Sequence, residues 1–457
     1  MDALFDTIAA VSTPHGEGGV GVIRISGPKA ADIADHVFFA HNNKKIAEGR
    51  GYSLRLGVVV EDGKTIDDAL ALLFRAPKSY TGEDVVELQC HGGRVVLSRV
   101  LRALTDAGAR AADRGEFTRR AFINGRVSLT EAEGVADIIS AASKQGEAAA
   151  YALSRGSLFR ETERIKEELL ALQSAIAAWI DFPEEDVEPI DDAQLTGQLQ
   201  ILKNSLQTLL DSYETGLIIL RGLPAAIAGT PNVGKSTLMN LLAGHEKAIV
   251  TPTAGTTRDV LEHHVQLGGT TLLLADTAGI RESEDAVEKI GVKKALERIE
   301  QSDLIFALFD SSRPLSDDDR DLIRKLSGRR VIALINKTDL PTALDVKEIE
   351  SAFETVVRIC ATEPGTLTVL DEVLEEYLGI NRFSPDMPIL MNERQRSAAA
   401  KALLAVTEAL LAVQGQMTPD VVFISLDEAL AAVMELSGEN VSDAVLNEVF
   451  SRFCVGK

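Results

Sequence analysis

Gly229-Thr230-Pro231-Asn232-Val233-Gly234-Lys235-Ser236 follows the apolar run Leu223–Ala228 and precedes a helical pattern. A strand, a glycine-rich loop ending in Gly-Lys-Ser and a helix together form a phosphate-binding loop. The backbone N–H groups of such a loop point at the phosphates, the lysine reaches the β and γ phosphates, and the serine hydroxyl binds Mg²⁺. We therefore assign nucleotide binding to Asn232, Val233, Gly234, Lys235, Ser236 and Thr237, and Mg²⁺ binding to Ser236.

A second motif, Asp276-Thr277-Ala278-Gly279, ends an apolar strand predicted at Thr271–Ala275. At a strand end beside the phosphate loop, the Asp276 carboxylate can hold the water shell of Mg²⁺, and the N–H of Gly279 can approach the γ-phosphate. All four residues of this motif are predicted to bind nucleotide.

A third motif, Asn336-Lys337-Thr338-Asp339, follows the apolar run Val331–Ile335 and predicts which base is bound. The Asp339 carboxylate can accept two N–H donors of guanine, whereas adenine would leave this acceptor unpaired. The loop that supports the base normally reads Ser-Ala-Lys, but this chain has Cys360-Ala361-Thr362. Because the donor needed there is a backbone N–H, we expect the change to be tolerated. In series, the motifs resemble the GTPase superfamily and predict a Ras-like α/β domain that prefers GTP over ATP.

Ile280 follows the second motif, at the position where Ras-like proteins carry the glutamine that orients the attacking water. Either the domain is a slow switch, or another group stabilises the transition state. With Asn232 and the run Gly255–Asp259, this substitution resembles the potassium-dependent subgroup of GTPases. The resemblance implies K⁺ ligands at Asn232, Thr251, Thr253 and Thr256, a Mg²⁺ ligand at Thr257, and a nucleotide-binding segment of Thr251, Pro252, Thr253, Ala254, Gly255, Thr256 and Thr257.

The same resemblance implies a water-positioning acid at Glu288, in the acid-rich stretch after Ile280. A charge-rich run is also typical of a solvated helix face. We predict the catalytic role, which rests on the resemblance. A cation fixed between the β and γ phosphates would be a preorganised electrostatic catalyst, and we expect GTPase domains to dimerise across their nucleotide faces to complete its site.

The composition limits the class of protein. With 457 residues, of which 45% are hydrophobic and 25% charged, the chain predicts a globular protein of two or three domains. It has no run of eighteen apolar residues, no basic and apolar export signal, and only three cysteines. We therefore expect a cytoplasmic protein without a membrane segment. The net charge of -22 argues against coating nucleic acid non-specifically, but not against holding one at a local site.

Periodicity predicts how the domains are arranged. The first 120 residues mix β-rich runs with one helix near Gly93–Ala107, which indicates an α+β domain. Helical periodicity starts at a capping-box spacing, Ser128 to Glu131, and returns after about residue 380. Because neither apolar stripe can be left in water, we expect one discontinuous helical domain around an inserted GTPase domain; the alternative is two separate small helical domains. The predicted domains are 1–120, 121–215 with 380–457, and the insert 216–379.

Long motifs outside the GTPase segment resemble the MnmE (TrmE) family of tRNA modification GTPases. They are Thr13–Gly27, Tyr80–Leu88, Gly115–Phe122 and the tail Phe453-Cys454-Val455-Gly456-Lys457. The resemblance implies an N-terminal domain that dimerises and binds 5-formyltetrahydrofolate or a related folate. It puts Arg24, Glu87, Arg126 and Lys457 at matching pocket positions, where a carboxylate suits the amide-like edge of a pterin and cations suit its acidic tail. For any one of these residues alone, a surface ion pair is the more ordinary role.

The resemblance also implies a part in the modification chemistry for Cys454. We reject lipid attachment, because Gly456 and Lys457 do not suit a prenylation motif. The implied function is modification of C5 of the wobble uridine in certain tRNAs, with a flavin-dependent partner, MnmG (GidA), in a heterotetramer or larger complex. GTP hydrolysis would drive opening and closing of paired GTPase domains.

Two alternatives remain open at this point. A ribosome-assembly GTPase of the same subgroup would share Gly229 to Asp339, but should also carry an RNA-binding module or a second GTPase domain. The other alternative is a non-catalytic switch protein that only recruits the flavoprotein.

Overall fold

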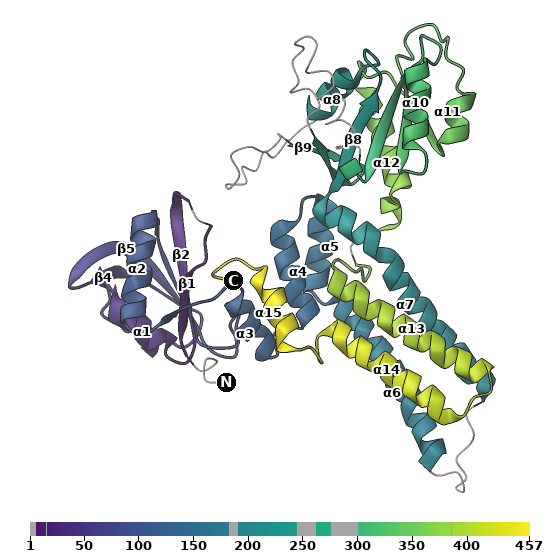
Figure 1. Cartoon of the computed structure of the whole chain (residues 1–457). Coiled ribbons are helices and arrows are strands. Elements are labelled where there is room, and N and C mark those ends of the chain that lie inside the picture. Colours follow the sequence, from purple (N-terminus) through teal and green to yellow (C-terminus); the bar gives the residue numbers. More distant parts are fainter. Residues whose placement is uncertain (1–5, 15, 182–190, 245–261, 276–299, 385) are drawn as a thin grey trace. The chain divides into compact units, whose positions relative to one another are not determined.

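The structure is a computed structural model that describes residues 6–14, 16–181, 191–244, 262–275, 300–384 and 386–457 (Figure 1). The N-terminal part of the chain folds into one sheet with helices. In this described part the sheet has the order β3-β4-β5-β6-β2-β1-β7, antiparallel except for the parallel pair of β1 and β7. The elements are β1 (Ile8–Val11), β2 (Gly18–Ser26), α1 (Ala30–Val37), β3 (Phe38–Ala40), β4 (Ser53–Glu61), β5 (Lys64–Phe74), β6 (Val85–Gly92), α2 (Arg94–Asp106), β7 (Arg110–Ala111) and α3 (Glu116–Ile123).

The two faces of this sheet differ because successive side chains of a strand point to opposite sides. On one face, Ile23, Val59 and Leu88 are fully buried in a core that also takes in α1 and α2. On the other face, Leu54 and Leu56 of β4 keep more than half of their surface exposed. By strand register, Phe39, Leu54, Leu56, Val58, Leu70 and Leu72 share this second face, which we call the open sheet face.

Helices from two distant segments form the predicted discontinuous helical domain. Helix α4 begins with the predicted capping box: the N–H of Glu131 donates to Ser128 Oγ at 3.2 Å, and the N–H of Ser128 donates to Glu131 Oε2 at 2.7 Å. Helices α6 and α14 contact each other through Gln173 Nε2 and Asp427 Oδ1 at 3.3 Å. The helices are α4 (Leu129–Ser140), α5 (Lys144–Ser154), α6 (Ser157–Asp181), α7 (Asp192–Arg221), α13 (Glu393–Gln414), α14 (Pro419–Ser437) and α15 (Asp443–Ser451).

The inserted α/β domain starts and ends at neighbouring points. The N–H of Leu390 donates to Ser212 Oγ at 3.1 Å, and Tyr213 donates its hydroxyl to Glu393 at 3.1 Å. The described strands have the order β13-β12-β11-β8-β10-β9, parallel except for β9. The elements are β8 (Leu223–Gly229), α8 (Lys235–Gly244), β9 (Glu262–Leu267), β10 (Thr270–Ala275), β11 (Leu304–Asp310), α10 (Asp317–Leu326), β12 (Val331–Asn336), α11 (Lys347–Ala352), β13 (Thr355–Arg358) and α12 (Gly365–Tyr377). The predicted multidomain fold class is confirmed.

The chain forms two compact units, whose limits lie inside helices α4, α5, α7 and α13. One unit holds Met1–Ala136, Leu153–Lys203 and Lys401–Lys457, and the other holds Asp137–Ala152 and Asn204–Ala400. These limits divide the chain differently from the expected domain boundaries, which stay a prediction. Among the described helices, α13 alone is apolar and long enough to cross a membrane, with a mean hydropathy of 1.3. Half of that stretch is buried, and core helices of soluble proteins share these properties.

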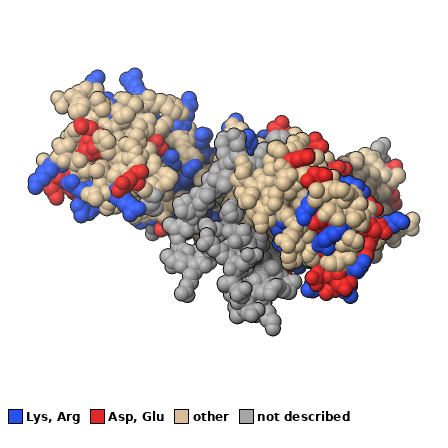
Figure 2. Space-filling model, turned by 90° about the horizontal axis from the view of Figure 1, so that it is seen from above, with Lys and Arg blue, Asp and Glu red and all other residues tan. Residues whose placement is uncertain are grey.

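Charge is unevenly distributed along the chain. The first 120 residues contain sixteen Lys and Arg residues and sixteen Asp and Glu residues, so the net charge of -22 belongs to the remaining residues. On the face shown in Figure 2, basic side chains are frequent around the N-terminal lobe at the left, and acidic side chains gather at the right. The acidic excess therefore does not extend to the N-terminal domain.

Candidate functional site

The loop between β8 and α8 has the conformation expected of a phosphate cradle. Lys235, the first residue of α8, donates from Nζ to the carbonyl oxygens of Gly229 and Thr230 at 2.8 and 2.9 Å. Burial lowers the pKa of this ammonium group. Asn232 has a φ of 61°, and its side chain is exposed together with those of Ser236 and Thr237. The lysine is thus held against the loop where phosphate oxygens could replace the carbonyl acceptors.

The buried carboxylate of Asp319 holds Thr230 of this loop, a contact that the sequence motifs did not predict. Asp319 of α10 accepts a hydrogen bond from the Thr230 hydroxyl at 2.8 Å and pairs with Arg313 at 2.8 Å, while Arg313 also donates to Thr230 Oγ1 at 2.9 Å. Burial alone would raise the pKa of Asp319, but Arg313 and the N-cap residue Ser316 together bring it below its usual range. The spacing Ser316 to Asp319 is a capping-box signal that could have marked the helix start, though not its contact with Thr230.

The side chain of Asn336 joins the phosphate loop to the loop that follows β13. Its Nδ2 donates to the carbonyl of Val233 at 2.8 Å, and its Oδ1 accepts from the N–H of Ala361 at 2.9 Å. The side chain is almost fully buried. Asn336 therefore fixes the distance between the predicted phosphate and base sites.

The predicted base site lies where β12 and β13 end. Lys337 has a φ of 64° and forms an ion pair with Asp310 at 2.5 Å, and Thr338 donates from Oγ1 to the carbonyl of Ile359 at 3.1 Å. Asp339 is exposed and accepts a hydrogen bond from Cys360 Sγ. The structure thus brings together the phosphate loop, the Asn336–Asp339 motif and the Cys360–Thr362 loop at the carboxyl ends of parallel strands, where ligands of open α/β sheets bind.

Several predicted positions lie outside the described residues. These are Thr251, Pro252, Thr253, Ala254, Gly255, Thr256, Thr257, Asp276, Thr277, Ala278, Gly279 and Glu288. Their roles stay predictions. Of the predicted cation ligands, the described ones are Asn232 and Ser236, both at the exposed side of the phosphate loop. A hydroxyl at the start of α8 and phosphate oxygens are oxygen ligands of the kind that Mg²⁺ prefers.

A second cluster surrounds Arg24 on the N-terminal sheet. Arg24 of β2 pairs with Glu87 of β6, with Nε 2.8 Å from Oε1. Its guanidinium carbon lies 5.3 Å from the ring centre of Tyr80 and 5.7 Å from that of Phe117. Tyr80 is in turn held by a 2.8 Å hydrogen bond between its hydroxyl and Thr118. Two aromatic rings thus fix a cation that the sequence predicted without them.

The tail of the chain packs against this cluster. The N–H of Gly115 donates to the carbonyl of Cys454 at 3.4 Å, and the Ser12 hydroxyl donates to the carbonyl of Gly456 at 3.0 Å. Gly456 has a φ of 92°, and a Cβ there would lie 2.3 Å from the carbonyl oxygen of Val11. A side chain would therefore push the tail off the N-terminal domain.

The predicted folate residues are brought together only in part. Burial and the nearby charge of Arg24 lower the pKa of Lys457, and Arg24 Nη1 lies 3.5 Å from the carbonyl oxygen of the adjacent Gly456. Cys454 is exposed in the same tail. Arg126 is exposed and lies beside Gly82 instead. A Cβ added to Gly82 would lie 3.2 Å from Cγ of Arg126. Among the described residues, no hydrogen bond or ion pair joins Arg126 to Arg24, Glu87 or Lys457.

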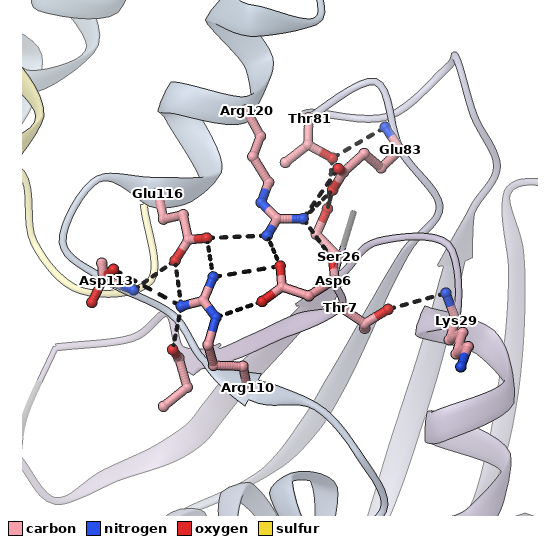
Figure 3. A network of polar contacts seen from close by, with 11 residues as sticks. Asp6, Thr7, Ser26, Lys29, Thr81, Glu83, Arg110, Asp113, Glu116 and Arg120 are labelled. Carbon is pink, nitrogen blue, oxygen red and sulfur yellow. Dashed lines mark hydrogen bonds and ion pairs between the residues drawn. The ribbon is translucent and has the colours of Figure 1, made fainter. Parts of the chain in front are cut away.

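A network of ion pairs supports the cluster. Arg120 of α3 is 1% exposed, and it contacts Asp6 at 2.5 Å, Glu116 at 3.0 Å and Glu83 at 3.1 Å. Figure 3 shows its guanidinium reaching between these carboxylates, with Arg110 on the far side of Asp6 and Glu116. The network links the segment just before β1, the segment that carries Tyr80 and the start of α3, so it fixes the surroundings of Arg24.

Comparison with known proteins covers nearly the whole chain. The model of the GTP-binding protein TrmE N-terminus matches residues 7–126, and that of the MnmE helical domain matches residues 129–454. The tRNA modification GTPases MnmE of Acetivibrio thermocellus and Heliobacterium modesticaldum are each 39% identical to it, over 99% of this chain and 99% of theirs. Among solved structures, the G domain of the T. maritima FeoB iron transporter is 28% identical over 34% of this chain and 98% of its own, with a TM-score of 0.26.

A nucleotide loop between β8 and α8, motifs at the ends of β12 and β13, and relatives of this identity over the full length lead to one assignment. The chain belongs to the MnmE (TrmE) family of tRNA modification GTPases and is a GTP hydrolase that acts in tRNA modification.

Proposed function

We propose that this enzyme modifies C5 of the wobble uridine of certain tRNAs, adding a carboxymethylaminomethyl or aminomethyl group with a folate one-carbon unit and a flavin-dependent partner protein. The observation that carries the proposal is the packing of the C-terminal tail on the N-terminal domain. This packing supports a shared site for Cys454, Lys457, Arg24 and Glu87. For tRNA as the substrate and for the flavin-dependent partner protein, the support is the family resemblance alone.

The chemistry of the Arg24 cluster fits a folate. Burial, and after it the charge of Arg24, lowers the pKa of Lys457, so an anionic glutamate tail would favour the charged form of this lysine. The Glu87 carboxylate can accept from N–H groups at the pterin edge, and the rings of Tyr80 and Phe117 offer apolar walls. When bound, the folate would supply the one-carbon unit; these residues would bind and orient it.

Arg24→Met should weaken binding of 5-formyltetrahydrofolate by at least about tenfold, because it removes a charge-assisted contact while keeping most of the side-chain volume. Isothermal titration calorimetry on the full chain measures this directly. Arg102→Met is the matched control, since Arg102 pairs with Glu61 on the surface and is well exposed. Equal folate affinity of the Arg24→Met variant and the unaltered chain would refute the folate site.

Homodimerisation is proposed through the open sheet face. Phe39, Leu54 and Leu56 of this face are exposed in one chain, and its other apolar residues are half-buried. A contiguous apolar face of this kind usually marks an interface, and a second copy of the same face is self-complementary under twofold symmetry. The N-terminal domain also lacks the acidic excess of the rest of the chain, so it is the part that two copies, or tRNA, can approach with least repulsion.

GTP turnover is proposed to depend on K⁺ and to drive opening and closing of paired GTPase domains. Asn232, with its positive φ, presents an exposed side chain at the phosphate loop, as a K⁺ ligand would.

We expect GTP hydrolysis to be at least about tenfold faster in KCl than in NaCl at equal ionic strength, because a fixed cation stabilises the transition-state charge. Phosphate release measured in both salts, with RbCl as a further comparison of ionic radius, tests this. Equal rates in K⁺ and Na⁺ would mean that no specific cation site exists.

Cys454→Ser is expected to abolish tRNA modification and leave the GTPase rate unchanged. The residue is exposed on the tail, while the nucleotide site uses none of the tail residues. Cells lacking the protein, complemented with the unaltered chain or with the variant, provide the test by mass spectrometry of their wobble uridines. Wobble-uridine modification should return with the unaltered chain and stay absent with the variant. If modification persists, Cys454 takes no part in the chemistry; if GTPase activity is lost as well, the substitution has damaged the fold.

The cytoplasm is the compartment we propose for this activity. All three cysteines, Cys90, Cys360 and Cys454, are free thiols, which fits a reducing environment. A flavoprotein partner and tRNA would both be reached there.

A further inference from the structure

The hydroxyl of Thr230 ties the phosphate loop to the segment where α10 starts. Its oxygen Oγ1 donates to Asp319 Oδ1 at 2.8 Å and accepts from Arg313 Nη2 at 2.9 Å. The hydroxyl proton is thus used by the carboxylate, and a lone pair is used by the guanidinium. Threonine is branched at Cβ, which restricts its rotation about χ1. A hydroxyl held by both partners therefore fixes the whole side chain of Thr230.

The two oxygens of Asp319, which is 2% exposed, have different partners. Oδ2 accepts from the N–H of Ser316 at 2.9 Å, from the Ser316 hydroxyl at 2.7 Å and from Arg313 Nη1 at 2.8 Å, so it caps α10 and carries the ion pair. Oδ1 accepts the hydroxyl of Thr230. A substitution at Thr230 therefore removes the contact with the loop and leaves the cap of α10 in place.

The main chain of Thr230 leads from this contact to the predicted phosphate-binding lysine. Its carbonyl oxygen accepts a hydrogen bond from Lys235 Nζ at 2.9 Å, beside the carbonyl of Gly229 at 2.8 Å. A rotation of the backbone at residue 230 would move this acceptor and release the ammonium group. The side chain of Thr230 therefore controls where the ammonium group of Lys235 is held before a nucleotide arrives.

The other end of the phosphate loop is held independently. Asn336 Nδ2 donates to the carbonyl of Val233 at 2.8 Å. Between the two fixed residues, Pro231 and Asn232 are exposed. A loop whose ends are fixed in advance loses less conformational freedom when its N–H groups close on a phosphate, and this strengthens binding. The contact with α10 thus supplies one of two anchors that prepare the loop.

We propose that Thr230 is a positioning residue for phosphate binding, held for that purpose by the Asp319–Arg313 pair at the start of α10. The ligand is the diphosphate part of the guanine nucleotide, and the inference rests on the predicted phosphate-binding role of Lys235. The sequence motifs start the nucleotide-binding residues at Asn232. The inference extends the site to a residue that acts through Lys235 and the loop backbone.

Thr230→Val is the test, because it removes the hydroxyl and keeps a branched side chain of similar size. Calorimetry on the full chain should show GDP bound about threefold to tenfold more weakly, as expected for loss of one hydrogen bond to a charged partner. Thr230→Ser restores the hydroxyl and should return the affinity to that of the unaltered chain. Thr208→Val is the matched control: Thr208 is exposed on α7, where its hydroxyl donates to the carbonyl of Asn204 in the same helix.

Two results would overturn the inference. Unchanged GDP affinity in Thr230→Val would show that the hydroxyl does not prepare the loop. Equal losses in Thr230→Val and Thr230→Ser would show that the size of the side chain, rather than its hydroxyl, matters. If Thr230→Val does not fold, as thermal unfolding without nucleotide would reveal, Thr230→Ala takes its place with the same expectations, because it puts no larger apolar group against the ion pair.

Lys235→Met separates this inference from the predicted phosphate site. The variant should lose most of its GDP affinity, because the ammonium group that reaches the phosphates is gone. If that loss occurs while Thr230→Val has no effect, the role of Thr230 alone is refuted. If Lys235→Met binds GDP as tightly as the unaltered chain, the phosphate site itself is wrongly placed.

Discussion

Gly234→Ala is expected to weaken GDP and GTP binding by about a hundredfold or more, which corresponds to roughly 3 kcal/mol. Gly234 has a φ of 103°, which side-chain-bearing residues rarely adopt. An added Cβ would lie 2.3 Å from Nδ2 of Asn336. Asn336 cannot move aside, because both ends of its amide are hydrogen-bonded, to Val233 and to Ala361. The phosphate loop must therefore shift, and its N–H groups lose their aim at the phosphates.

Gly244→Ala is the matched control for this prediction. Gly244 lies at the end of α8, and a Cβ there would meet no atom within 4 Å. Calorimetry with GDP, accompanied by thermal unfolding without nucleotide, distinguishes a lost site from a lost fold. Full-strength nucleotide binding by Gly234→Ala would mean that the loop tolerates the displacement, and the geometry around Asn336 would not be a requirement of binding.

Arg120→Met is expected to lower the free energy of unfolding of the N-terminal domain by about 3–5 kcal/mol, because removing one member of a buried ion-pair network leaves its partners unpaired. The guanidinium of Arg120 is almost completely buried among Asp6, Glu83 and Glu116. Without it, these carboxylates would face one another in a partly desolvated space. Urea unfolding followed by hydrogen exchange of the N-terminal strands measures the loss. The exposed Arg102→Met variant should change stability little.

The pH dependence of the same network gives a second check on it. Burial raises the pKa of Asp6 and of Glu116, but hydrogen bonds from Arg110 and Arg120 outweigh it and bring both values below the usual range. A carboxylate with a lowered folded pKa stabilises the protein above its unfolded pKa, and this contribution disappears as the pH falls through the folded pKa. The unaltered domain should therefore lose stability below about pH 4. Arg120→Met should show a shallower loss over that range, and an equally steep loss would contradict the network.

The local sequence was sufficient to predict a helix, strand or loop where a sequence motif falls on that element. The strand β8, the loop 229–236 and helix α8 follow from apolar runs and glycine positions, as does the cap of α4 at Ser128. Helix α1 was missed because its buried face is largely alanine, at Ala30, Ala31 and Ala34, which gives little hydrophobic contrast. Short apolar runs and small residues carry the weakest periodic signal.

The contacts that complete each site could not be read from local pattern. Thr230 and Asp319 are 89 residues apart, and the partners of Arg24 come from three different segments. Their meeting depends on how the strands pair and where α3 and α10 start. The family resemblance supplied Arg24, Glu87 and Lys457, but it supplied neither the aromatic rings around Arg24 nor the thiol beside Asp339.

The hydrogen bond between Ser12 and Gly456 spans 444 residues, and this has a consequence for biosynthesis. The N-terminal sheet leaves the ribosome and can fold while the GTPase insert and the later helices are still being translated. The cluster around Arg24 nevertheless lacks its contacts with the tail until residues 454 to 457 emerge. On the proposed folate role of the Arg24 cluster, a polypeptide that ends before these residues would lack part of the site for the one-carbon donor.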